Sequence, residues 1–280
     1  MDAAAGLDER HAALVAHLRR LGRVVVAFSG GADSAFLLAA AARVLGPEQV
    51  VAATAVSPSL PDSELHAAAR FAAGLGVRHE APRTAEMDRP GYAENAGDRC
   101  YFCKAELLDV LRPLADSLGV AHVATGTNAD DAVAGFRPGI RAAAERGAET
   151  PLRDAGLTKA QVRELSRRWG LSTADKPAAA CLSSRIAFGQ RITPERLRRV
   201  DRAESGLRAA LLDRGVPVRN LRVRDLGDRA RVEVDADLVA AVAEQDLDAL
   251  VPGFPAVELD ARGFRSGSMN ELLPDPVRYR

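Results

Sequence analysis

Two short segments of this chain combine residue types that can do chemistry. The first is the loop SGGADS, residues 29–34, which lies between an apolar run and a helical pattern. Glycines let backbone N–H groups approach an anion closely, and the start of a helix adds partial positive charge. The loop lacks the Gly-Lys-Ser/Thr ending of a Walker A loop. It therefore predicts a phosphate site of another type, and the alternative is a glycine turn that only joins a strand to a helix.

The second segment is the C-x-x-C pair Cys100 and Cys103, which Lys104 follows directly; the remaining cysteine is Cys181. Three cysteines are a poor disulfide framework, whereas C-x-x-C suits metal binding or sulfur chemistry in a reducing compartment. The histidines offer no obvious fourth ligand for a structural zinc site. The alternative is that one or two thiols are small buried apolar side chains. Lys104 is either an anion-binding point charge or a solvated helix lysine.

Arginines and hydroxyls supply further candidate anion ligands. Ser184 and Arg185 follow Cys181 closely, and Arg222 and Arg224 alternate along a predicted strand. Because alternate residues of a strand share a face, the second pair predicts an anion clamp. The alternative is a pair of solvated arginines on an edge strand.

Polar residues also follow two of the predicted strands. Thr54 ends the second strand region, and TGTNADD, residues 125–131, follows the fourth. The carboxyl ends of parallel strands face the crevice in which nucleotides bind, so Thr54 and Thr127 are candidate nucleotide contacts. Alternatively, Asn128 and the residues up to 131 only cap a helix.

The elements around these residues must position them. Apolar runs near residues 24–28, 49–56, 77–82 and 121–127 alternate with helical patterns. This alternation predicts an α/β fold with a doubly wound parallel sheet over residues 1–186, and residues 187–280 predict a smaller α+β domain. The stretch from 128 to about 156 shows little periodicity and predicts a long loop. Thr158 predicts the cap of the helix that follows it.

Composition narrows the class of protein. The 280 residues include 38 basic and 38 acidic side chains, so the net charge is zero. This balance argues against general binding to nucleic acid or to a membrane surface. The N-terminal region lacks the basic start and the apolar core of a signal peptide, and no apolar stretch is long enough to span a bilayer. We therefore expect a cytoplasmic protein with no nucleic-acid or membrane partner.

The loop pattern S-G-G-x-D-S resembles the PP-loop of the ATP pyrophosphatase superfamily. Together with RCYFCK, TGTNADD, KPAAACLSSR and GFRSGSMN, it resembles the LarE-type sulfurtransferases over almost the whole chain. The resemblance implies a PP-loop domain followed by a domain for substrate binding and oligomerisation, in a homo-oligomer with a hexamer as the expected size. It implies that ATP transfers AMP to a carboxylate of pyridinium-3,5-biscarboxylic acid mononucleotide and that sulfur then displaces AMP. The product is a precursor of the nickel-pincer nucleotide, the cofactor of lactate racemase.

The resemblance also implies roles for individual residues. Asp33 and Glu233 would bind Mg²⁺, and the arginine pair would bind the phosphate of the nucleotide substrate. The predicted catalytic residues are Cys100, Cys103, Lys104 and Cys181. The predicted ATP-binding residues are Ser29, Gly30, Gly31, Asp33, Ser34, Thr54 and Thr127. The predicted substrate-binding residues are Ser184, Arg185, Arg222 and Arg224.

The family donates sulfur in two ways. In one, the cysteine that matches Cys181 gives up its own sulfur and becomes dehydroalanine. In the other, three cysteines hold a [4Fe-4S] cluster whose fourth iron carries an extra sulfide. Cysteines occupy all three cluster positions here, and thiolates suit such a cluster, so we favour the cluster version with Cys100, Cys103 and Cys181 as ligands.

Two other functions compete with this interpretation. A PP-loop tRNA thiolase combines the same loop with cysteines, but its large polyanionic substrate favours a basic surplus that this chain lacks. A nucleotide-binding module with a structural metal would bind ATP without releasing pyrophosphate. The complete loop from Ser29 to Ser34 disfavours the second.

Overall fold

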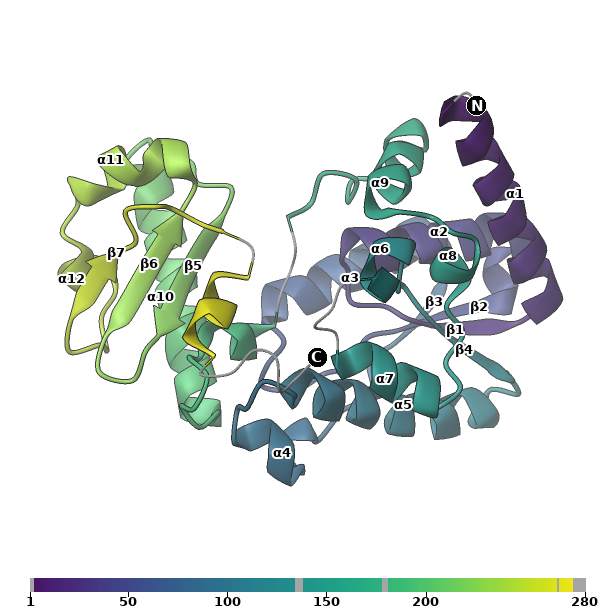
Figure 1. Cartoon of the computed structure of the whole chain (residues 1–280), viewed down its shortest axis with the longest axis horizontal. Coiled ribbons are helices and arrows are strands. Elements are labelled where there is room, and N and C mark those ends of the chain that lie inside the picture. Colours follow the sequence, from purple (N-terminus) through teal and green to yellow (C-terminus); the bar gives the residue numbers. More distant parts are fainter. Residues whose placement is uncertain (1–2, 134–137, 178–180, 266, 274–280) are drawn as a thin grey trace. The chain divides into compact units, whose positions relative to one another are not determined.

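The computed structural model describes residues 3–133, 138–177, 181–265 and 267–273, which form two compact units (Figure 1). Of the described residues, the first unit holds 3–86 and 100–177, and the second holds 87–99 and 181–273. Packing therefore assigns 87–99 and 181–186 to the second unit, whereas the predicted boundary between functional domains lies after residue 186. That functional boundary stays a prediction.

The first unit is built on a parallel sheet of four strands in the order β3-β2-β1-β4. The central strand β1 pairs in parallel with β2 on one side and with β4 on the other, so that Val24 lies opposite both Val50 and His122. This arrangement confirms the predicted α/β fold. The strands are β1 (Val24–Ala27), β2 (Val50–Ala53), β3 (Arg78–Glu80) and β4 (His122–Thr125).

Helices cover both faces of this sheet (Figure 1). Val24 and Val26 point into one apolar cluster, with α1 (Ala3–Leu21), α2 (Ala32–Leu45) and α3 (Asp62–Gly74). Val25 and Ala27 point the opposite way, into a cluster with α5 (Arg99–Ser117) and α7 (Pro138–Glu145). Side chains alternate along a strand, so an uninterrupted apolar strand requires a cover on each side. Within the described ranges, no helix is both long and apolar enough to cross a membrane.

The region after Asn128 corrects the sequence prediction. Instead of one long loop, the described residues form α6 (Ala129–Val133), α7 and α8 (Pro151–Asp154). Segments of four to eight residues have too few turns to show a helical period in the sequence. The next helix, α9 (Lys159–Arg168), begins as predicted, because Thr158 and Gln161 form a reciprocal capping box. Shorter elements of this unit are η1 (Pro47–Gln49) and η2 (Glu86–Asp88), the latter continuing into the second unit.

The second unit is a smaller mixed α/β layer. Its sheet has the order β5-β6-β7, with an antiparallel first pair and a parallel second pair. Leu207 and Leu211 of the long helix α10 pack on Val223 and Val232 of the sheet, which confirms the expected α+β character. The strands are β5 (Leu221–Asp225), β6 (Ala230–Val234) and β7 (Val257–Leu259). The helices are α4 (Pro90–Ala93), η3 (Leu182–Arg185), α10 (Pro194–Asp213), η4 (Ala236–Leu238), α11 (Val239–Ala243), α12 (Leu247–Leu250) and η5 (Ser268–Leu272).

Asn95 joins the two sequence segments of the second unit. Its side chain is fully buried, and Nδ2 donates to the carbonyls of Ile186, Ala187 and Gln190 at 3.3, 2.7 and 2.9 Å. Arg99 donates to the Asn95 amide oxygen. Asn95 has a φ of 56°, a left-handed conformation that asparagine tolerates better than most residues. The residue therefore fixes a turn and satisfies three buried carbonyls together.

We expect Asn95→Gly to lower the free energy of unfolding of the second unit by about 2–3 kcal/mol, because three carbonyls lose their shared donor. Asn95→Ala should cost about 1 kcal/mol more, since alanine is also strained at this φ. Urea unfolding of both variants checks the pair. Loss of less than about 0.5 kcal/mol in Asn95→Gly would show that water replaces the amide.

Candidate functional site

The loop SGGADS connects the carboxyl end of β1 to α2 as predicted. Gly31 is the N-cap of α2 and provides no side-chain cap, so the first N–H groups of the helix receive no side-chain acceptor from it. The carbonyls around the loop are held by other groups. Phe28 O accepts from Thr54 Oγ1 at 2.7 Å, and Gly31 O accepts from the N–H of Ala35 at 2.9 Å. Helix N–H donors without a cap at the end of a parallel strand make an anion-binding geometry.

Hydroxyl groups and a second loop lie close to these donors. Ser29 Oγ and Ser34 Oγ are 3.1 Å apart, and Ser34 is buried. A Cβ at Gly126 would lie 2.7 Å from the Ser34 nitrogen, so only glycine allows this close approach of the loop that follows β4. The Thr127 hydroxyl, 3.1 Å from that of Thr125, comes from this loop. The structure thus brings the predicted threonine loop against the start of α2.

Asn128, by contrast, caps α6. Its Oδ1 accepts from the N–H groups of Asp130 and Asp131 at 2.9 and 3.2 Å. The capping alternative is therefore confirmed for this residue.

Asp33 lies in the first turn of α2 and has one occupied and one unoccupied oxygen. Its Oδ2 accepts from Lys159 Nζ at 2.5 Å, while its Oδ1 is buried and has no hydrogen-bond partner. An orphaned carboxylate oxygen fits a hard cation such as Mg²⁺. Among the described residues there is no group of three or more His, Cys, Asp or Glu side chains that could hold a metal. A magnesium ion on Asp33 would therefore complete its shell with phosphate oxygens and water.

Lys159 was missed by the sequence prediction. It is the first residue of α9, where the Thr158 cap fixes the helix start, and it reaches Asp33 across 126 positions of sequence. The sequence does offer one clue to Lys159: lysine is rare in this chain, since only three of the 38 basic residues are lysines.

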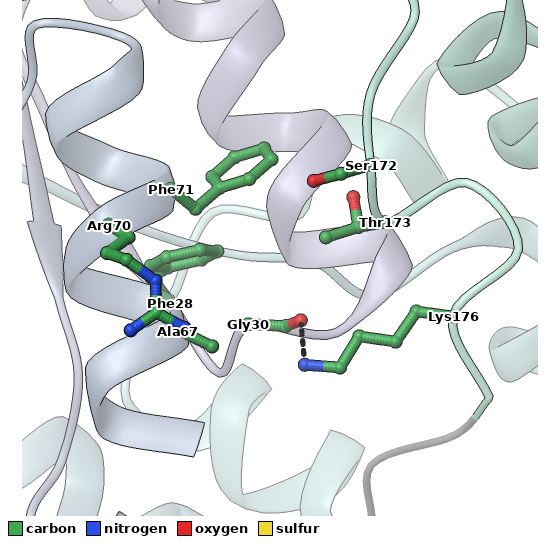
Figure 2. Close-up of a pocket in the computed structure, with 8 residues that line it drawn as sticks. All are labelled: Phe28, Gly30, Ala67, Arg70, Phe71, Ser172, Thr173 and Lys176. Atoms are coloured by element: carbon green, nitrogen blue, oxygen red, sulfur yellow. Dashed lines mark hydrogen bonds between the residues drawn. The ribbon is translucent and has the colours of Figure 1, made fainter. Parts of the chain in front are cut away.

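Lys176 also contacts the loop. Its ammonium group donates to Gly30 O at 3.1 Å (Figure 2). It also donates to Glu64 Oε2 at 2.6 Å. A cavity of about 360 Å³ adjoins this contact. Its lining includes the apolar residues Phe28, Ala67 and Phe71 and the polar residues Arg70, Thr173 and Lys176.

Thr54 lies at the end of β2, but its hydroxyl serves the protein interior. It donates to Phe28 O, so it must accept from His79 Nε2, which is 2.9 Å away. Burial lowers the pKa of His79, against the opposing effect of Glu80. The threonine is itself buried, and its predicted contact with a nucleotide stays a prediction.

Cys100 and Cys103 lie in the first turns of α5 and, three residues apart, share a helix face. Lys104 follows them, and burial lowers the pKa of its ammonium group, against the charges of Cys103, Cys100 and Asp131. The start of α7 is close, since a Cβ on Gly139 would lie 3.4 Å from Cys100 O. Neither thiol is part of a disulfide. The paired thiols fit part of the donor set of an iron–sulfur cluster.

Cys181 belongs to the second unit, where it is half-buried and forms the N-cap of η3. Its carbonyl accepts from Ser184 Oγ at 2.8 Å and from Arg185 Nη1 at 3.0 Å. The predicted substrate residues Ser184 and Arg185 therefore hold the backbone of Cys181, the predicted third ligand of the cluster. The approach of Cys181 to the other two thiols stays a prediction.

Arg185 belongs to a buried cluster of arginines in the second unit. It pairs with Glu204 at 2.8 Å, and Arg224 pairs with Glu233 at 2.7 Å. Arg222 lies over the Phe264 ring at 5.1 Å. Burial and the nearby Arg185 lower the pKa of Arg222 to about 10.

Both residues of the predicted clamp are buried, so the alternative of solvated edge arginines is wrong. Arg185, Arg222 and Arg224 thus bring positive charge together in this cluster, a setting that suits an anion. Glu233 uses one oxygen for Arg224 and the other for Ser268. Its predicted role as a magnesium ligand stays a prediction.

Comparison with known proteins identifies the family to which this chain belongs. No family model matches the chain. An uncharacterized protein of Synechocystis sp. is 43% identical over 259 residues, which cover 90% of this chain and 94% of the relative. An uncharacterized protein of Methanocaldococcus jannaschii is 25% identical over 80% of this chain and 82% of its own.

A third relative carries a functional name. The pyridinium-3,5-bisthiocarboxylic acid mononucleotide synthase of Lactiplantibacillus plantarum is 34% identical over 275 residues, which cover 96% of each chain. The matched residues extend over both compact units. The chain therefore belongs to the LarE family, the family of this synthase.

Proposed function

We propose that the protein is an ATP-dependent sulfurtransferase that converts the carboxylates of pyridinium-3,5-biscarboxylic acid mononucleotide to thiocarboxylates, in the biosynthesis of the nickel-pincer nucleotide. The observation that carries this proposal is the full-length similarity to the Lactiplantibacillus plantarum synthase. The arrangement of the loop supports the use of ATP, because it offers donors for phosphate beside a carboxylate with one free oxygen. The absence of a basic surplus disfavours a tRNA substrate.

In the first step, a substrate carboxylate oxygen attacks the α-phosphorus of ATP, and the bond to the β-phosphate breaks. The N–H groups at the start of α2 and the hydroxyls of Ser29 and Ser34 would bind the leaving pyrophosphate. Mg²⁺ on Asp33 Oδ1 would offset negative charge on these phosphates when it is bound. Lys159, already on the other oxygen of Asp33, would add a second positive charge there.

The arginine cluster would hold the phosphate of the mononucleotide. Burial and the nearby Arg185 lower the pKa of Arg222 to about 10, so this guanidinium would gain from a nearby anion. A phosphate at this position would stabilise the charged form, and the contact gains strength from the low dielectric of the buried site. The paired carboxylates of Glu204 and Glu233 keep Arg185 and Arg224 in place.

In the second step, sulfur replaces AMP on the acyl carbon and leaves a thiocarboxylate. An iron–sulfur cluster held by Cys100, Cys103 and Cys181 would supply this sulfur. The partly buried Lys104 beside the pair would stabilise the anionic thiolates and the charge that develops on the acyl-adenylate. Ser184 and Arg185 would orient Cys181 through its carbonyl. The alternative donor is the sulfur of Cys181 itself.

We expect Asp33→Asn to lower the rate of AMP formation by at least about 100-fold, because the cation loses its carboxylate ligand. The exposed Asp62 of α3 provides the matched control. Asp62→Asn makes the same change of charge and should keep nearly full activity. Coupled detection of pyrophosphate measures both, and equal rates in the two variants would contradict the assignment of Asp33.

Arg222→Gln should raise KM for the mononucleotide by about 30-fold or more while KM for ATP changes less than about twofold, as expected for loss of one member of a buried charge pair. Arg214, an exposed arginine after α10, is the control for loss of one positive charge. A parallel rise in both KM values would argue for damage to the fold rather than loss of a phosphate contact.

The two sulfur routes differ in what the protein contains. Under the cluster route, anaerobic reconstitution should load about four irons per chain with broad visible absorption. Cys103→Ser should lower this iron content. Under the alternative, protein recovered after one turnover should have lost the mass of hydrogen sulfide at Cys181. Mass spectrometry of the recovered protein, alongside iron analysis, decides between them.

A further inference from the structure

The peptide between Gly30 and Gly31 is the softest part of the phosphate loop. Gly30 has a φ of 70°, in the left-handed region, and neither residue has a Cβ to restrict rotation of the peptide plane. The carbonyl oxygen of Gly30 accepts from Lys176 Nζ at 3.1 Å (Figure 2). Lysine therefore holds one side of a peptide that could otherwise turn over.

The direction of this carbonyl fixes the direction of an N–H group. The C=O and N–H of a planar trans peptide point in opposite directions. With Gly30 O turned toward Lys176, the N–H of Gly31 points to the other side of the loop. There it donates a long hydrogen bond, 3.5 Å, to Ser29 Oγ, one of the two serine hydroxyls of the loop. If the peptide turned over, the anion would meet a carbonyl oxygen instead of this donor.

We propose that Lys176 is a positioning residue for phosphate binding, which acts by tying back the Gly30 carbonyl so that the Gly31 N–H faces the anion. The proposal rests on the proposed function, since it takes the phosphates of ATP as the anion. Lys176 does not need to touch the phosphate. Two of its three N–H bonds are directed to Gly30 O and to Glu64 Oε2.

Glu64 has a separate part in this arrangement. It comes from α3, and its carboxylate is 2.6 Å from Lys176 Nζ, so it holds the ammonium group over the loop. Replacement of Glu64 leaves the bond from Lys176 to Gly30 available. A positioning role and a direct phosphate contact therefore predict different results for changes at Glu64.

The test compares wild-type protein with Lys176→Met and Glu64→Gln. Binding of Mg²⁺ with the α,β-methylene analogue of ATP is measured by calorimetry, and KM is measured for ATP and for the mononucleotide. Lys176→Met should weaken binding of the analogue by about 10- to 100-fold, the effect of one misdirected hydrogen bond to a charged group. KM for ATP should rise in parallel, while KM for the mononucleotide stays within about twofold, which general loss of structure would not produce.

Glu64→Gln should change analogue binding by less than about threefold, because the Gly30 bond survives. Lys176→Arg, which keeps a donor within reach of Gly30 O, should recover part of the loss and remains informative where Lys176→Met does not fold. Wild-type affinity in Lys176→Met overturns the proposal. Tenfold tighter binding in Glu64→Gln also overturns it, since that result marks Lys176 as a phosphate ligand restrained by Glu64. A wild-type protein that binds no analogue overturns the proposed function itself.

Discussion

The uncapped start of α2 is the constraint around which the first unit is arranged. A helix start leaves N–H groups that need acceptors, and Gly31 supplies none from a side chain. Side chains from other segments also occupy backbone carbonyl oxygens of the loop with hydrogen bonds. The carbonyls of Phe28 and Gly30 are turned toward Thr54 and Lys176, each from a distant part of the chain. What remains is a surface of donors, which is the electrostatic requirement of an anion site.

The second unit meets a related requirement with side chains instead of backbone. It buries Arg185, Arg222 and Arg224 in one cluster, in which Glu204 pairs with Arg185 and Glu233 pairs with Arg224. Burial and the nearby Arg185 lower the pKa of Arg222, so the charged form of this guanidinium is less favoured than that of an exposed arginine. An anion bound beside Arg222 would favour its charged form. Under the proposed function, each unit would bind a phosphate, the first through backbone N–H groups and the second through arginines.

Local sequence patterns predicted the parts of this arrangement that depend on neighbouring residues. The strand alternation, the glycine loop and the Thr158 cap are of this kind, and the structure confirms them. The contacts of Asp33 with Lys159 and of Gly30 with Lys176 span 126 and 146 positions. No periodicity links such residues, because only the order of strands and helices in space brings them together. The burial of Arg222 likewise depends on packing. Alternation along the strand predicts that Arg222 and Arg224 share a face, but it does not predict that this face is buried.

Lys159 and Lys176 bind oxygen atoms in a different way from the buried arginines. Arginine presents a planar fork that pairs best with two oxygens, as Arg185 does with Glu204 through Nε and Nη2. An ammonium group is compact and has three rotatable donors, so it can bind single oxygens that lie in different directions. Lys176 does this with one carbonyl and one carboxylate oxygen, and Lys159 reaches one oxygen of Asp33 and leaves the other open. Two of the chain's three lysines thus bind the loop carbonyl and the loop aspartate through single oxygens.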